Sequence, residues 1–361
     1  MNWPAWLPLR NDLSPLTPYG APQLPADAAL NTNENPYSPS PALQQAIAEA
    51  VLKVSADLNR YPDRDAIQLR TKLANYINSA SGTDFSMNNI WAANGSNEII
   101  QSIFLAFGEG VALGFTPSYS MHPLIANVCG TNWVDGKRNP DFSLDVESAV
   151  LQIASLKPKI TFITTPNNPT GGSITIAEIQ LLADACVKVC GLLVVDEAYA
   201  EFSSQESAVA LIRKNPHVLV IRTMSKAFAF AGARLGYLVC DGAVKDAMML
   251  VRLPYHLSAI TQAAACTAID FKDELLGYVS TLIAAREALV VELHNLGLKT
   301  IPSAANFILF TGFKADTPKL WSDLLGKGVL IRDVGLEGYL RVSVGNEAEN
   351  TLFISALKEL I

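Results

Sequence analysis

The feature that most constrains the fold of this chain is a series of short apolar segments between about residues 95 and 240. They are VALGF (111–115), ITFITT (160–165), GLLVVDEAY (191–199), VLVIRT (218–223) and RLGYLVC (234–240). Strands that are apolar along nearly their whole length are typical of a sheet covered on both faces. Residues 175–190, between two of these segments, carry apolar residues at helical spacing. This alternation predicts an α/β fold with a mostly parallel sheet, whose ligand sites lie at the carboxyl ends of strands.

The pattern changes after residue 260. A long helix candidate at 277–297 is followed by a strand-like segment at 300–310, a further helix, and strand-like segments at 328–333 and 338–345. This order predicts a small α+β domain. We therefore expect three parts: an N-terminal arm (1–30) that packs with the small domain, a large domain (31–260) that carries the ligand site, and a small C-terminal domain (261–361).

Composition excludes several classes of protein. Half of the 361 residues are hydrophobic, which is enough for a large and a smaller domain, and the net charge of −7 argues against nucleic acid or an anionic membrane as partner. No apolar run reaches the roughly 18 residues of a membrane span. The first 22 residues lack the basic and apolar regions of a signal peptide, so we expect a cytoplasmic protein.

Cysteine and histidine spacing makes a metal site an unfavoured interpretation. The five cysteines are scattered and odd in number, which fits a reducing compartment rather than a disulfide framework. Cys186 and Cys190 are four residues apart on a predicted helix, where core packing is the commoner explanation. The histidines form no zinc-binding spacing; they are His122, His217, His256 and His294.

Candidate site residues follow the strands. Asp196 ends a buried strand and Tyr199 follows three residues later, so the carboxylate can face a ligand, although an isolated aspartate there is more often a helix cap or an ion-pair partner. Asn168 lies in TTPNNPTGG, which by itself indicates only a turn. Ser96 and Asn97 follow a glycine at the start of a predicted helix, where unpaired N–H groups can bind phosphate.

A single lysine stands out in RTMSKAFAFAG (222–232). Lys226 follows Thr223 and Ser225 and precedes an apolar run, and Arg234 lies shortly after it. Hydroxyl groups and a guanidinium are suited to an anion, because the planar arginine fork pairs with two phosphate oxygens. A lysine in such a water-poor segment has its ammonium form disfavoured, which makes the neutral amine available.

Together these groups match the needs of one cofactor, pyridoxal 5'-phosphate. We expect Lys226 to bind it as a Schiff base, and Asp196 to keep its pyridine nitrogen protonated so that the ring can accept electrons. Asn168 and Tyr199 are expected to hydrogen-bond the ring hydroxyl oxygen. The expected phosphate-binding residues are Ser96, Asn97, Thr223, Ser225 and Arg234. Tyr119, in TPSYSMHP, could stack on the ring, although ordinary packing explains it equally well.

The sequence also resembles a known family. NTNENPYSPSP, RYPDRD, NGSNEII, TPNNPTGG, VVDEAYAEF, RTMSKAFAFAGARLGY, PSAANFILF and GYLRVSVG look like the signatures of the histidinol-phosphate aminotransferases, in order from about residue 8 to 355. These enzymes belong to the fold-type-I, aspartate-aminotransferase-like group that uses pyridoxal phosphate, and LIRDVGLEGYLRVSVG resembles the actinobacterial members. One departure is Ala229, where many relatives have glycine.

The resemblance implies further site residues. Arg341 matches the arginine that receives the α-carboxylate of glutamate or 2-oxoglutarate, or the phosphate of histidinol phosphate, and Arg332 is a second candidate phosphate contact; a surface ion pair is the alternative for both. Tyr61 matches a tyrosine that reaches the cofactor phosphate of the neighbouring subunit, which implies a homodimer. Tyr19 and the segment 33–37, with Asn35, resemble an N-terminal lip over the substrate, although they could simply pack there.

The implied activity is transamination between L-histidinol phosphate and 2-oxoglutarate, a step of L-histidine biosynthesis, with Lys226 as the base and then the acid that moves the proton. An aromatic amino-acid aminotransferase would use the same cofactor groups with a different pocket, and a decarboxylase acting on threonine phosphate is a more distant alternative. A non-catalytic protein of the same fold is a third, and the presence of Lys226, Asp196 and Arg341 together argues against it.

Overall fold

A central seven-stranded sheet forms the large part of the molecule. The computed structural model describes residues 3–18 and 20–361. The strand order is β2-β8-β7-β6-β5-β3-β4, and only β8 runs antiparallel to its neighbours. The bounds are β2 Ile90–Ala93, β3 Val111–Thr116, β4 Asn132–Lys137, β5 Ile160–Thr164, β6 Leu192–Asp196, β7 Val218–Thr223 and β8 Gly236–Val239. The predicted α/β class with a mostly parallel sheet is therefore confirmed.

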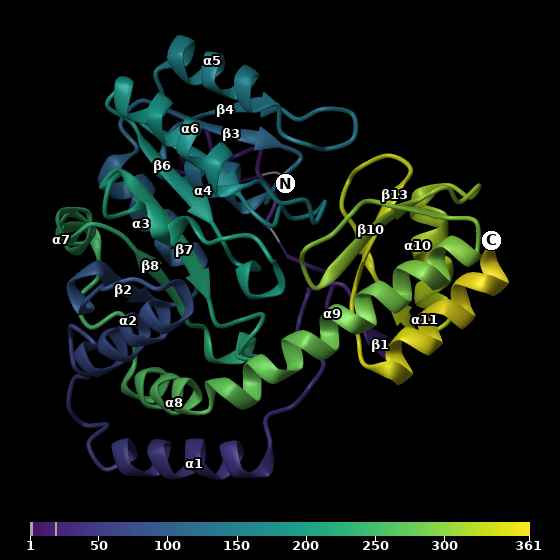
Figure 1. The fold of residues 1–361 in the computed structure, drawn as a ribbon, viewed down its shortest axis with the longest axis horizontal. Helices are drawn as coiled ribbons and strands as arrows, with labels where there is room; N and C mark the ends of the chain where they lie inside the picture. Colours follow the sequence, from purple (N-terminus) through teal and green to yellow (C-terminus); the bar gives the residue numbers. More distant parts are fainter. Residues whose placement is uncertain (1–2, 19) are drawn as a thin grey trace.

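Helices cover both faces of this sheet, which explains why its strands are apolar throughout. On β6, Leu193 and Val195 belong to one buried cluster and Val194 to another, as expected when successive side chains point to opposite faces. One cluster includes side chains of α2 (Ile67–Ser81), α5 (Val146–Leu156), α6 (Ile176–Lys188) and α8 (Ala259–Asp270). The other includes side chains of α3 (Ser96–Phe107), α4 (Met121–Cys129) and α7 (Gly242–Val251). Figure 1 shows these helices around the sheet.

Local sequence explains where the elements begin. Helix α6 starts at a capping box: Thr175 Oγ1 accepts from the Glu178 N–H (3.3 Å), and Glu178 Oε2 accepts from the Thr175 N–H (2.7 Å). Two strands of the central sheet are absent from the sequence prediction. Strand β4 lies at the sheet edge and is partly exposed and polar, and β2 has only four residues, so neither shows a clear strand pattern.

The small domain is built on a second, antiparallel sheet. Its order is β12-β13-β10-β9, covered by α10 (Thr317–Gly326) and α11 (Glu347–Leu360). The bounds are β9 Lys299–Thr300, β10 Phe307–Thr311, β12 Arg332–Asp333 and β13 Tyr339–Ser343. The predicted small α+β domain is thus present. Helix α9 (Lys272–Asn295) crosses from the large domain to this small domain (Figure 1): Leu282 packs in the large core and Leu289 in the small one.

The chain that precedes the large domain joins the small one. Strand β1 (Ala28–Ala29) pairs in parallel with β11 (Val329–Leu330). Helix α8, which runs from residue 259 to residue 270, packs against α1 (Pro41–Ser55) and α2 of the large domain. The division into 1–30, 31–260 and 261–361 stays a prediction.

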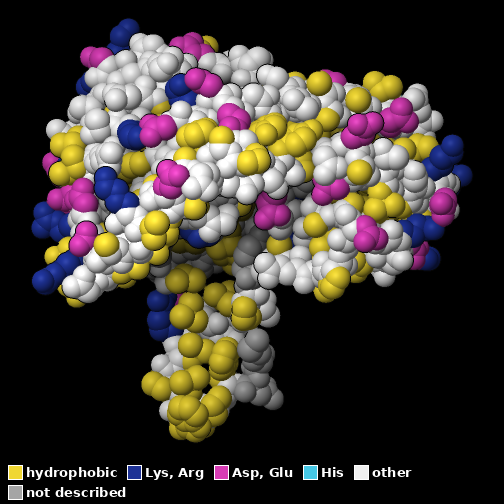
Figure 2. All heavy atoms as spheres, turned by 90° about the horizontal axis from the view of Figure 1, so that it is seen from below, with side chains coloured by type: hydrophobic (Ala, Val, Ile, Leu, Met, Phe, Trp, Pro, Cys, Tyr) yellow, Lys and Arg dark blue, Asp and Glu magenta, His cyan; other side chains and the backbone are white. Residues whose placement is uncertain are grey.

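Residues 3–18 form an arm of turns and irregular backbone. Trp6 is 79% exposed, and Arg10 anchors the arm through a hydrogen bond from Nη1 to the Val128 carbonyl at the end of α4 (3.0 Å). Figure 2 shows the arm as a narrow, largely hydrophobic projection from the body. Among the described helices, none has the length and apolar character needed to cross a lipid bilayer.

Candidate active site

One pocket of about 590 Å³ lies where the carboxyl ends of β5, β6 and β7 face the small domain. Such strand ends are the usual ligand site of α/β sheets. Of the residues predicted for the site, the pocket is lined by Ser96, Asn97, Tyr119, Asn168, Asp196, Tyr199, Thr223, Ser225, Lys226, Arg234, Arg332 and Arg341. The fold therefore brings these predicted residues together although the first and last of them, Ser96 and Arg341, are 245 positions apart.

Lys226 is half-buried at the floor of this pocket. Its Nζ donates to the Thr32 carbonyl at 2.8 Å. Burial lowers the pKa of Lys226 to about 8, and the positive charges of Arg341 and Arg234 act in the same direction, while Glu34 opposes them. The lysine thus has a substantial neutral fraction near neutral pH, as its surroundings in the sequence indicate.

Asp196 is buried and held by two donors. Its Oδ1 accepts from the Ala198 N–H (3.2 Å), and its Oδ2 lies 3.1 Å from His122 Nε2. Because an ionised carboxylate can only accept, Nε2 carries the proton in this contact. His122 in turn packs against Phe162 at a ring distance of 4.6 Å. The carboxylate is therefore fixed in orientation beside the pocket.

Tyr199 and Asn168 are held by groups from outside their own segments. The Tyr199 hydroxyl accepts from Asn33 Nδ2 (2.9 Å), and its ring packs edge-on against Phe307 of β10. Asn168 Oδ1 accepts from Arg341 Nη1 at 2.5 Å. The loop after β5 and strand β13 are thereby joined across the pocket, so the small domain contributes directly to the site.

The amino end of α3 and Arg234 form a corner of the pocket that is suited to an anion. Gly95, at the N-cap position of α3, has no side chain to cap the first N–H groups, and a Cβ there would lie 2.6 Å from Arg234 Nη2. The Thr223 hydroxyl donates to Ser225 Oγ (3.0 Å) in the same part of the pocket. Uncapped helix N–H groups beside a guanidinium are suited to a phosphate.

Two arginines meet on the small-domain wall. Arg332 of β12 and Arg341 of β13 are direct partners in the antiparallel register. Both line the pocket, and the Arg341 guanidinium also donates to the Asn31 carbonyl (2.7 Å) and lies over the Phe307 ring. Like charges opposite each other on a sheet repel, so an anion between them is favourable.

Two of the predicted residues that the structure describes, Tyr61 and Asn35, do not line the pocket. Tyr61 is 79% exposed and stacks on Tyr255 with ring centroids 4.3 Å apart. Asn35 lies beside the pocket-lining Glu34, and its Oδ1 accepts from the Tyr37 N–H (3.0 Å). Tyr19 lies outside the described residues.

The structure adds three groups that the sequence prediction misses. They are His122, bonded to Asp196; Asn33, bonded to Tyr199; and the Thr32 carbonyl, bonded to Lys226. The sequence analysis considers His122 only as a possible zinc ligand. Its position three residues after Tyr119, following a predicted strand, could have marked it as a residue of the site. Asn33 belongs to the predicted lip segment, in which the resemblance points to Asn35 instead.

Ala229, three residues after Lys226, and Tyr119 lie close to the groups described above. Ala229 has a φ of +51°, a left-handed conformation that glycine adopts without cost and alanine adopts with strain. Tyr119 donates from its hydroxyl to Asn97 Oδ1 (3.2 Å), and its ring meets His122 edge-on. A tyrosine thus lies between the helix terminus and the residue that orients Asp196.

Comparisons with known proteins agree with this geometry. The family model described as aminotransferase class I and II matches residues 27–357. The histidinol-phosphate aminotransferase of Mycobacterium sp. strain JLS is 52% identical over 98% of this chain and 94% of its own, and that of Nocardia farcinica is 54% identical over 96% and 90%. The resemblance seen in the sequence, including its actinobacterial character, is therefore confirmed.

Solved structures show the same fold. Histidinol-phosphate aminotransferase from Sinorhizobium meliloti, in complex with pyridoxal-5'-phosphate, superimposes with a TM-score of 0.81 at 24% identity, covering 93% of this chain and 91% of that one. A single mutant of aspartate aminotransferase from Thermus thermophilus reaches a TM-score of 0.84 at 22% identity, covering 98% and 99%. The predicted aspartate-aminotransferase-like fold is confirmed. The chain belongs to the aminotransferase class I and II family.

Proposed function

We propose that this chain is a pyridoxal-phosphate-dependent aminotransferase that transfers an amino group between L-histidinol phosphate and 2-oxoglutarate in L-histidine biosynthesis. The observation that carries the proposal is one pocket that holds Lys226, with its lowered pKa, together with Asp196 and the Arg332–Arg341 pair. Relatives 52–54% identical over nearly the whole chain bear the name histidinol-phosphate aminotransferase.

The residues present fit the cofactor. A phosphate suits the corner between the amino end of α3 and Arg234, because a Cβ at Gly95 would fill the space beside the guanidinium. A protonated ring nitrogen suits the buried Asp196 carboxylate, which His122 holds in place through one of its oxygens. Lys226 supplies the amine for covalent attachment. When bound, pyridoxal phosphate supplies an electron-accepting ring that stabilises negative charge on the substrate carbon.

Lys226 has two tasks in this proposal. Its neutral amine would hold the cofactor, and as a free amine Nζ would be placed to accept the proton from the substrate carbon that bears the amino group. Burial and the two nearby arginines keep the pKa near 8, so that Nζ can both accept and return a proton near neutral pH. The Thr32 carbonyl at 2.8 Å directs the amine within the pocket.

Asp196 and His122 act as a unit. The hydrogen bond from His122 Nε2 fixes Oδ2, and the Ala198 N–H fixes Oδ1, so the carboxylate keeps the orientation in which it can hold the proton of the ring nitrogen. Tyr199, oriented by Asn33, and Asn168, oriented by Arg341, are placed to bond the ring hydroxyl oxygen.

The pocket chemistry supports an anionic substrate in both half-reactions. Arg332 and Arg341 can bind the phosphate of histidinol phosphate, and Arg341 can bind the carboxylate of glutamate or 2-oxoglutarate with its planar fork. The same two arginines thus serve two substrates, each of which carries an anionic group, a phosphate in one and a carboxylate in the other.

The assembly belongs to the proposal too. We infer a homodimer in which Tyr61 reaches the cofactor phosphate of the other subunit; its 79% exposure, outside its own pocket, supports this role. The enzyme is proposed to work in the cytoplasm, in keeping with its five free cysteines.

A half-reaction assay tests the function. The visible absorbance of the purified protein is followed as histidinol phosphate, phenylalanine or aspartate is added. We expect rapid change with histidinol phosphate alone; equal rates with phenylalanine would indicate an aromatic amino-acid aminotransferase. Lys226→Ala should lose at least about a hundredfold in turnover while staying folded, and Lys245→Ala, a lysine outside the pocket, should retain it. Normal turnover by Lys226→Ala would refute the proposal.

A further inference from the structure

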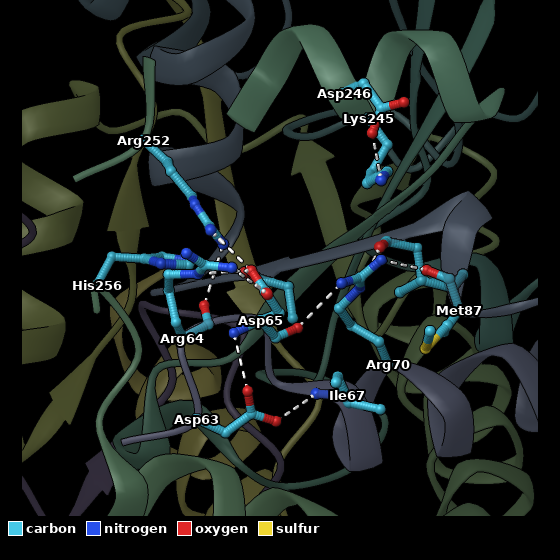
Figure 3. Close-up of polar contacts among 12 residues, drawn as sticks. Asp63, Arg64, Asp65, Ile67, Arg70, Met87, Lys245, Asp246, Arg252 and His256 are labelled. Atoms are coloured by element: carbon cyan, nitrogen blue, oxygen red, sulfur yellow. Dashed lines mark hydrogen bonds and ion pairs between the residues drawn. The ribbon is translucent and has the colours of Figure 1, made fainter. Parts of the chain in front are cut away.

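The segment 60–65, which joins α1 to α2, has no regular secondary structure and yet is firmly held. Arg252, in the loop between α7 and α8, donates from Nη2 to Asp65 Oδ1 (2.7 Å) and from Nη1 to the Arg64 carbonyl (3.0 Å), as Figure 3 shows. The Arg252 side chain is only 9% exposed. A nearly buried guanidinium that bonds both a carboxylate and a backbone carbonyl fixes the direction of this segment.

Two further side chains hold the same segment from other sides. Arg70 of α2 donates from Nη1 to the Asp65 carbonyl (3.0 Å) and from Nη2 to the Met87 carbonyl (2.6 Å). Gln262 of α8 donates to the Asp63 carbonyl (2.9 Å). Residues 63–65 are therefore attached to α2, to α8 and to the loop before α8, which leaves them little freedom relative to the large domain.

Tyr61 lies beside this anchored stretch and points outward. Its ring stacks on Tyr255, which follows Arg252 by three residues, with an interplanar angle of 14°. The two segments that Arg252 joins also expose Leu58, Leu250 and Leu253, at 53%, 86% and 74%. Large apolar side chains gathered on fixed segments are typical of a protein interface, and under the proposed function the partner is a second copy of this chain.

The same loop is tied to the phosphate-binding corner of its own subunit. His256 Nε2 donates to the Ala92 carbonyl (2.9 Å), and the His256 carbonyl accepts from Asn94 Nδ2 (2.9 Å). Asn94 directly precedes Gly95 and the amino end of α3. The loop 252–258, on which Tyr61 stacks through Tyr255, is therefore hydrogen-bonded to the segment that leads into α3.

We propose that Arg252, through its hydrogen bonds to Asp65 and the Arg64 carbonyl, is a positioning residue that holds the Tyr61 hydroxyl in place for the cofactor phosphate of the partner subunit. This inference rests on the proposed function, because Tyr61 has a ligand only in the homodimer. Arg252 acts only through the segment that carries Tyr61. Because this segment is already ordered in the free subunit, Tyr61 loses less conformational entropy when it binds the phosphate.

A double-mutant cycle tests the inference. The dissociation constant of pyridoxal phosphate is measured by equilibrium dialysis for the wild-type dimer, Tyr61→Phe, Arg252→Met and the double variant. Tyr61→Phe keeps the stacked ring and should weaken binding about tenfold, since a hydrogen bond to a charged group is lost. Arg252→Met should weaken it about fivefold, by leaving Tyr61 less ordered. The double variant should bind no more weakly than Tyr61→Phe, because Arg252 acts through the hydroxyl.

Other outcomes are equally informative. Independent, multiplicative effects would assign Arg252 a general structural role and overturn the inference. If Tyr61→Phe weakens cofactor binding and Arg252→Met does not, Arg252 is not a positioning residue, and Tyr61 remains a contact to the partner's cofactor. No effect of Tyr61→Phe in an intact dimer would instead refute that part of the proposed function.

Controls separate positioning from stability. Arg213→Met removes an exposed arginine that pairs with Asp84 at 2.9 Å and should leave the cofactor affinity unchanged. Arg252→Lys keeps the charge and loses the planar fork, so its dissociation constant should fall between those of wild type and Arg252→Met. If Arg252→Met does not fold, Arg252→Lys replaces it in the double-mutant cycle. Sedimentation velocity confirms the dimer for each variant.

Discussion

At the scale of single residues, the chemistry depends on where one amine lies. Lys226 lies in a pocket that removes much of its water, where Arg341 and Arg234 disfavour its ammonium form and Glu34 favours it. With a pKa of about 8, roughly one amine in ten is neutral at pH 7, against roughly one in three thousand for an ordinary lysine. The surroundings therefore raise the supply of nucleophile several hundredfold.

The titration of Lys226 can be measured directly in the cofactor-free protein. Acetylation at this residue, followed by mass spectrometry of the peptide, should rise with pH with a midpoint near 8, because only the neutral amine reacts. Arg341→Met should raise the midpoint, since a cation that disfavours the ammonium is removed, and Glu34→Gln should lower it. Lys319, an exposed lysine, serves as the internal reference for the reagent. A wild-type midpoint above pH 10 would contradict this account.

At the scale of elements, a buried ionic network joins the strands that carry the site. Arg222 on β7 forms ion pairs with Glu201 (Nη1 to Oε1, 2.8 Å) and Glu197 (Nε to Oε2, 3.0 Å), and all three side chains are less than 10% exposed. Burial alone would lower the pKa of Arg222, but Glu201 and Glu197 together raise it above its ordinary value. Glu197 directly follows Asp196, and Arg222 precedes Thr223, so the network aligns two strand ends that line the pocket.

Breaking this network should be costly. Arg222→Met leaves two buried carboxylates without their cation, and we expect the free energy of unfolding to fall by about 3–5 kcal/mol. Equilibrium urea unfolding of the cofactor-free protein at fixed concentration measures the change. Arg213→Met, at an exposed pair, should change it by less than about 1 kcal/mol. Equal losses for the two variants would show that the buried network contributes no more than a surface pair.

At the scale of the whole molecule, the N-terminal arm is the part that the single chain does not bury. Trp3 donates from Nε1 to the Ser14 carbonyl within the arm (3.1 Å), yet Trp3 and Trp6 remain 43% and 79% exposed. The arm projects from the body (Figure 2), and Arg10 hydrogen-bonds the Val128 carbonyl at the end of α4. In the proposed homodimer, a second copy is the partner that would cover these rings.

The arm predicts a specific effect on assembly. Replacing both Trp3 and Trp6 by serine should raise the dimer dissociation constant at least about tenfold, because buried tryptophans dominate the energetics of interfaces. The thermal stability of each subunit should change little, since the rings are exposed within it. A dilution series in sedimentation velocity measures the constant. Leu151→Ser, at a leucine of α5 that is 71% exposed, is the matched control, and a double variant that dimerises as tightly as this control would contradict the prediction.

Much of this organisation could be predicted from the order of the amino acids. Strands β3, β5, β6, β7 and β8 are recognisable as apolar runs because both faces of the sheet are covered, whereas β2 and β4 are too short or too exposed to be recognised in this way. Lys226, Asp196 and Arg234 could be recognised because each side chain has distinctive chemistry in a strand-end or turn context.

The contacts that orient those groups could not be predicted in the same way. His122 meets Asp196 across 74 residues, Asn33 meets Tyr199 across 166, and Thr32 meets Lys226 across 194. The amino-acid order reports local periodicity, burial and chemical type, and from these it determined the fold class and the reactive groups. Which distant donor faces which acceptor depends on how the two domains pack, because side chains separated by a hundred residues meet only after the sheets, helices and loops have taken their places.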